Sequence, residues 1–77
     1  MKPLAFVFKL EQVLNENNIT KNALAREAKV RPNLIYEICD NKTRRIELEN
    51  FDKIIKTLTE MTGKKIQVHD LIEYVEL

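Results

Sequence analysis

The chain has 77 residues and a formal net charge of +1, with 44% of its residues hydrophobic and 32% charged. These values are typical of one small folded domain, here taken as residues 1–77, and they exclude a disordered tail. The single cysteine, Cys39, cannot form an intramolecular disulfide, which favours a reducing, cytoplasmic compartment. We expect neither a membrane span nor a signal peptide, because the apolar runs are short and the apolar start lacks a cleavage site.

Hydrophobic spacing predicts helices along the whole chain. The first is expected to end near Asn17, because the asparagine-rich segment 15–18 favours a helix end and a turn. Its apolar face is expected to consist of Phe6, Leu10, Val13 and Leu14. The apolar residues at 3–8 exceed what one helix face needs, and "LIEYVEL" at 71–77 alternates like a strand at its end. Both ends therefore either extend the core or form a dimer contact.

The second and third helices are predicted to lie close together in the chain. The second begins after Thr20, a good N-cap residue, and runs to about Ala28. The third has Pro32 in its first turn, where a missing N–H group costs nothing, and ends near Asp40 and Asn41. A connection of about three residues forces the two helices to cross at a large angle. The small side chain of Ala25 is placed to allow that crossing.

The fourth helix, from about Leu48 to Met61, has the strongest apolar stripe. The stripe consists of Leu48, Phe51, Ile54, Ile55, Leu58 and Met61. Gly63 follows at the position where a helix commonly ends in a left-handed residue. A last short helix is predicted from about Val68 to Tyr74.

The frame around the short connection resembles a helix-turn-helix. It consists of Leu24, Ala25, Ala28, Val30, Ile35 and Ile38. The segments "ITKNALAREAKVRPNLIYEICDNKTRRIELENFDKIIKTL" and "HDLIEYV" extend the resemblance from about residue 6 to 74, with "VRPN", "NKTRRI" and "DLIEY" as its most specific parts. They are similar to the phage Cro and lambda-repressor type family, also called the xenobiotic-response-element type, and in particular to small stand-alone bacterial and phage members.

The resemblance implies an all-α, compact five-helix bundle with its helix-turn-helix core at about residues 20–41. Three residues depart from the family pattern. Lys29 stands at the left-handed turn position where the family usually has Gly, at a cost of about 1 kcal/mol. Arg31 replaces the usual Ser or Thr before the third helix, and Glu47 replaces the usual Ser before the fourth.

The resemblance also implies a function: binding of double-stranded DNA by sequence, with the third helix in the major groove. The implied base-contacting residues are Arg31, Pro32, Asn33, Tyr36 and Glu37. Asn33 suits adenine, whereas Glu37 suits cytosine or an ion pair with Arg31 or Arg44. The implied phosphate contacts are Thr20, Lys21, Asn22, Lys42, Thr43, Arg44 and Arg45. The charge distribution agrees, since residues 20–45 carry a net charge of +4 and residues 46–77 a net charge of −3.

These features predict a cytoplasmic, nucleoid-associated transcriptional regulator, most plausibly a repressor. A homodimer through Leu4–Phe8, Leu71–Leu77 or both would read a palindromic operator. We expect no enzyme, no cofactor, no metal and no small-molecule ligand, because one His, one distant Cys and no glycine-rich loop offer no catalytic or ligand-binding set. The near-neutral total charge keeps one alternative open, a protein-binding adaptor or antitoxin-like module with the same fold.

Overall fold

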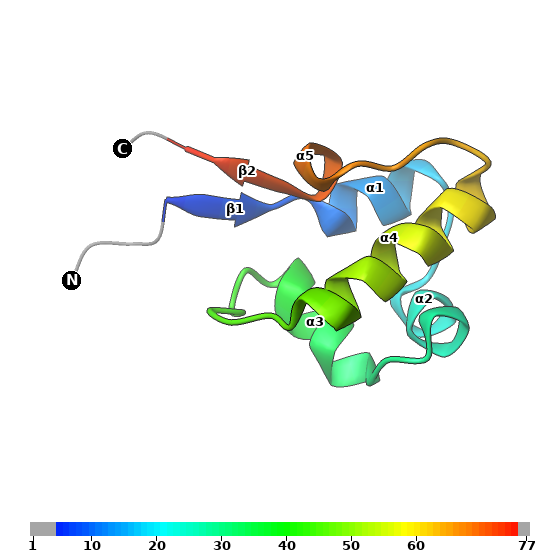
Figure 1. Ribbon diagram of the computed structural model, residues 1–77, viewed down its shortest axis with the longest axis horizontal. Helices are drawn as coiled ribbons and strands as arrows, with labels where there is room; N and C mark the ends of the chain where they lie inside the picture. Colours follow the sequence, from blue (N-terminus) through cyan, green and yellow to red (C-terminus); the bar gives the residue numbers. More distant parts are fainter. Residues whose placement is uncertain (1–4, 76–77) are drawn as a thin grey trace.

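The computed structural model describes residues 5–75, which form a small helical body with a short two-stranded sheet (Figure 1). The elements follow in the order β1 (Phe6–Phe8), α1 (Leu10–Glu16), α2 (Lys21–Ala28), α3 (Pro32–Cys39), α4 (Leu48–Thr62), α5 (Val68–Leu71) and β2 (Ile72–Tyr74). Figure 1 shows β1 and β2 projecting together from one end of the helical body. Among residues 5–75, none of the helices has the length and apolar character needed to cross a membrane.

The five-helix fold is confirmed in outline, and a small two-stranded sheet is added to the expected all-α architecture. Strands β1 and β2 pair antiparallel, with Phe6 opposite Tyr74 and Phe8 opposite Ile72. Phe6 therefore lies in a strand and not on the face of the first helix, and the last helix ends at Leu71 instead of continuing to Tyr74. The aromatic and β-branched residues at these positions fit a pleated surface, and pairing satisfies their backbone groups. The fold is mostly helical with a small sheet.

The core is built from one apolar face of each helix. Its buried residues are Leu10, Leu14, Leu24, Ala25, Ala28, Ile35, Ile38, Cys39, Phe51, Ile54, Leu58 and Leu71. The predicted stripe of α4 is wrong at both ends, because Leu48 is 81% exposed and Met61 is 39% exposed. Both residues lie at the ends of a helix that is longer than the surface it packs against, so only its middle turns are covered.

The predicted start of α2 and the predicted ends of α2 and α4 are confirmed. The Thr20 hydroxyl accepts a hydrogen bond from the Ala23 N–H at 3.0 Å, as an N-cap residue does. Lys29 ends α2 with φ = 59°, and Gly63 ends α4 with φ = 69°, so both are left-handed. Arg31, which precedes α3, makes no side-chain cap, as the sequence predicts. The strain at Lys29 is therefore real, because a side chain in this region costs about 1 kcal/mol relative to Gly.

Ala25 lies where α2 meets α3, and it is 1% exposed. The Val30 N–H donates to the Ala25 carbonyl at 3.1 Å, which closes the end of α2 directly before α3 begins. Figure 1 shows the axes of α2 and α3 crossing steeply instead of running side by side. This crossing buries Ile35 and Ile38 of α3 and leaves the opposite face of that helix uncovered.

Candidate nucleic-acid interface

The uncovered face of α3 carries the residues predicted to contact bases. Arg31, Pro32, Asn33, Tyr36 and Glu37 are all exposed. Asn33, Tyr36 and Glu37 share one side of the helix, because residues three and four positions apart are neighbours on a helix surface. Glu37 forms no ion pair within residues 5–75, so the sequence-based pairing with an arginine does not occur in the free protein.

The N-terminus of α2 lies beside this face and holds Tyr36 in place. The Tyr36 hydroxyl donates to Asn22 Oδ1 at 3.2 Å, and Lys21 Nζ lies 5.2 Å from the centre of the Tyr36 ring. Lys21 and Asn22, which are predicted to contact phosphates, therefore both contact Tyr36, which is predicted to contact bases. The sequence analysis did not foresee this contact, because it joins positions in different helices and depends on the crossing angle.

Lys21 also pairs with Glu11, a residue of α1 that the sequence analysis did not select. The Lys21 Nζ and Glu11 Oε1 atoms are 3.4 Å apart. Partial desolvation acts to lower the pKa of Lys21, but Glu11 and more distant acidic groups outweigh it, so the pKa is raised above its ordinary value. Glu11, Lys21 and Tyr36 line an open hollow of about 530 Å³ between α1, α2 and α3.

The backbone at the start of α2 offers donors next to this hollow. The first hydrogen bond of α2 is donated by the Leu24 N–H to the Thr20 carbonyl at 3.1 Å. The amides of Lys21 and Asn22 precede that bond, so the helix itself provides no acceptor for them. Together with the positive end of the helix dipole, they favour an anion at this position.

The connection between α3 and α4 carries the second group of predicted phosphate contacts. Lys42, Arg44 and Arg45 are exposed, which agrees with that role, but Thr43 is only 9% exposed. The Thr43 hydroxyl is buried and has no hydrogen-bond partner within the described residues. A buried hydroxyl cannot reach a phosphate, so the prediction that the Thr43 side chain contacts a phosphate is wrong.

Asn41 links this connection to the sheet. Its side-chain Oδ1 accepts a hydrogen bond from the Phe8 N–H at 2.7 Å, and its backbone is left-handed with φ = 58°. The Lys42 N–H donates to the Glu37 carbonyl at 2.9 Å, which closes the end of α3. The start of the cationic connection is therefore anchored both to α3 and to β1.

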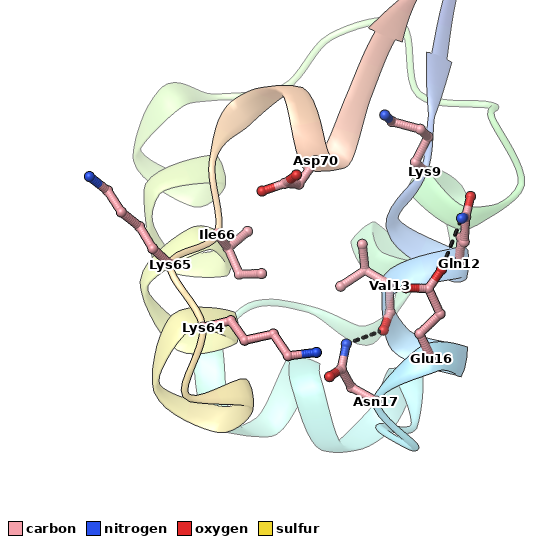
Figure 2. Close-up of a pocket in the computed structure, with 9 residues that line it drawn as sticks. All are labelled: Lys9, Gln12, Val13, Glu16, Asn17, Lys64, Lys65, Ile66 and Asp70. Carbon is pink, nitrogen blue, oxygen red and sulfur yellow. Dashed lines mark hydrogen bonds between the residues drawn. The ribbon is translucent and has the colours of Figure 1, made fainter.

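A separate pocket of about 340 Å³ lies between α1 and the segment 64–70 (Figure 2). Its charged groups have both signs, and one of them, Asp70, already accepts a hydrogen bond from the Gln67 N–H at 2.8 Å. Figure 2 shows the Lys64 side chain directed toward Asn17, whose amide donates to the Val13 carbonyl at 2.8 Å. None of the residues predicted to bind DNA lines this pocket. No cluster of three potential metal ligands occurs within the described part of the chain.

Comparison with known proteins agrees with this geometry. The family model of the Cro/C1-type HTH DNA-binding domain matches residues 9–76, which is nearly the whole chain. Neither the comparison with curated proteins nor the comparison with solved structures gives a match. The matched span contains all five helices, including the crossing of α2 and α3. The chain therefore belongs to the family of Cro/C1-type helix-turn-helix DNA-binding domains.

Proposed function

We propose that this DNA-binding domain is a sequence-specific regulator of transcription that inserts α3 into the major groove and represses by covering a promoter. The observation that carries the proposal is the uncovered face of α3, which lies between two groups of cationic and amide donors. Phosphate contacts at both flanks would fix the position of α3, and base contacts from its exposed face would supply the sequence preference.

The proposed base contacts follow from the chemistry of the exposed side chains. Asn33 can pair bidentately with adenine, and Arg31 can pair with guanine or reach a phosphate. Tyr36 can pack on a thymine methyl while its hydroxyl stays bound to Asn22. Pro32 offers only apolar contact, and Glu37 accepts from cytosine.

The proposed phosphate contacts form two groups. At the start of α2, they are the backbone amides of Lys21 and Asn22 with the side chains of Thr20, Lys21 and Asn22. After α3, they are Lys42, Arg44 and Arg45. The first group uses the positive end of a helix, and the second uses exposed cations on an anchored connection. Neither group reads sequence.

We also propose that two copies associate through the sheet. Phe6 and Tyr74 are 54% and 67% exposed, and their rings pack edge to face with centroids 5.3 Å apart. Across the strand pair, the Val75 N–H donates to the Ala5 carbonyl and the Lys9 N–H donates to the Leu71 carbonyl. Backbone groups along an antiparallel strand alternate between its two edges, so those of Tyr74 point to the outer edge of β2. A two-fold axis at this edge would join two sheets into one. Leu4 and residues 76–77, which belong to the sequence-based dimer prediction, lie outside the described residues.

Such a dimer would read a palindrome with half-sites about 34 Å apart, and effective concentration would strengthen two weak half-site contacts. Tyr74→Lys would place two charges against each other at the axis and should shift sedimentation from dimer to monomer. Tyr36→Lys, a matched change of a tyrosine on α3, should leave the sedimentation of the free protein unchanged. Equal sedimentation of all three proteins as monomers would contradict the dimer.

The proposed function is tested by fluorescence anisotropy with duplex DNA. We expect wild-type protein to bind random duplex at low salt and to select a palindromic site from a random pool. Lys21→Ala or Arg44→Ala should weaken binding to all sequences alike and reduce the salt slope by up to about 0.9. No binding at low salt would contradict the proposal. It would favour the adaptor, for which the exposed aromatic pair of the sheet and the acidic last third would serve as docking surface.

A further inference from the structure

Glu11 places a carboxylate beside the proposed phosphate site at the start of α2. Its Oε1 atom lies 3.4 Å from Lys21 Nζ, and the Lys21 side chain is only 27% exposed whereas that of Glu11 is 52% exposed. The Lys21 ammonium also lies over the ring of Tyr36, which limits where its side chain can go. The ammonium is therefore held between an acid from α1 and an aromatic ring from α3.

A carboxylate and a phosphate compete for the same ammonium because both offer anionic oxygens at hydrogen-bonding distance. A duplex approaching the start of α2 would have to take Lys21 from Glu11, or would have to accept Glu11 as a like charge near its own phosphate. Both alternatives lower affinity. Neither depends on base sequence, since the start of α2 faces the DNA backbone in the proposed arrangement.

We propose that Glu11 is an internal competitor for the phosphate site at the start of α2, and that it limits the affinity of this protein for every duplex. The inference rests on the proposed function and adds a residue from outside the helix-turn-helix. Glu11 sets the strength of binding, whereas Asn33 and Tyr36 set its base preference. The same pair also keeps Lys21 close to Tyr36 in the free protein.

The test is a comparison of Glu11→Gln with Glu60→Gln, a matched change that removes one negative charge from the exposed surface of α4. Anisotropy titrations use a selected site and a random duplex at several salt concentrations. Partly exposed ion pairs have modest strength, so we expect Glu11→Gln to bind both duplexes about two- to fivefold more tightly at low salt. Glu60→Gln should stay within about 1.5-fold of wild type, because Glu60 forms no ion pair with any described residue of the proposed interface.

A double-mutant cycle identifies Lys21 as the group that Glu11 restrains. In a Lys21→Ala background the gain from Glu11→Gln should shrink, because no ammonium remains to be released and only the repulsion between Glu11 and the phosphate is relieved. The salt slope of Glu11→Gln should become steeper than that of wild type, and this gain together with the loss in Lys21→Ala should add up to about 0.9, the contribution of one phosphate contact. Glu11→Ala should act in the same direction, and far-UV circular dichroism checks that each variant is folded.

The outcomes separate the inference from the proposed function. Equal gains for Glu11→Gln and Glu60→Gln would overturn the inference alone, because net charge would then explain the effect. A loss of affinity in Glu11→Gln would also overturn it, since Glu11 would then position Lys21 for DNA. Failure of wild type to bind any duplex would overturn the proposed function, and the inference with it.

Discussion

We expect the contact between α2 and α3 to depend on the small side chain of Ala25. Ala25 is 1% exposed, and its carbonyl accepts the hydrogen bond from Val30 that closes α2. Ala25→Leu adds three non-hydrogen atoms to a packed junction, and such overpacking costs about 1–3 kcal/mol. A domain of this size loses about 4–8 °C in midpoint per kcal/mol, so we expect the midpoint to fall by about 4–24 °C.

Ala23→Leu is the matched control, because Ala23 is on the same helix but only half-buried. It should cost no more than about 0.5 kcal/mol, since Ala and Leu have similar helix propensities. Thermal unfolding followed by far-UV circular dichroism gives both midpoints. Ala25→Val adds fewer atoms than Ala25→Leu and should lower the midpoint by a smaller amount. Among the variants that remain folded, Ala25→Leu should bind a selected site more weakly because α3 is displaced. Equal midpoints for Ala25→Leu and Ala23→Leu would refute the proposed role of the junction.

Three further predictions concern stability and reactivity. Lys29→Gly should raise the free energy of unfolding by about 1 kcal/mol, because it removes a side chain from a left-handed residue. Asn18→Gly (φ = 56°) should raise it less, because Asn tolerates that conformation. Equal increases for the two variants in urea denaturation would contradict this. Asn41→Gly should be less stable than Asn18→Gly by about 1 kcal/mol, because it loses the hydrogen bond from the Phe8 N–H. Asn41→Asp keeps an acceptor for that N–H and should lose less, and urea denaturation measures the free energy of unfolding of each variant. Burial raises the pKa of the Cys39 thiol, so a thiol reagent at neutral pH should react with Cys39 much more slowly than it reacts with free glutathione. Rapid modification of the native protein would contradict that protection.

The parts of the fold that depend on neighbouring residues could be predicted from the sequence. Thr20 caps α2 with its own hydroxyl, and Gly63 ends α4, because both devices act within one turn. The left-handed conformation of Lys29 is implied by the family resemblance, because the family usually has Gly at this turn position. Exposure of the predicted base-contacting residues follows from the same helical spacing, because Ile35 and Ile38 fix which face is buried.

The parts that depend on distant residues could not be predicted in the same way. Strand β1 exists because β2 from the other end of the chain pairs with it, and no local pattern reveals that partner. The burial of Thr43 depends on how the connection folds over the core, and the exposure of Leu48 depends on where α4 extends past it. The pairing of Glu11 with Lys21 likewise joins two helices whose relative position is tertiary.

Base reading by α3 is tested most directly with Asn33→Ala, measured on a selected site and on random duplex across several salt concentrations. A bidentate contact with adenine contributes about 1–3 kcal/mol, so affinity for the selected site should fall by about 5- to 150-fold. Affinity for random duplex and the salt slope should stay close to wild type, because Asn33 carries no charge and would not hold a phosphate. Equal losses on both duplexes would contradict base reading by this helix.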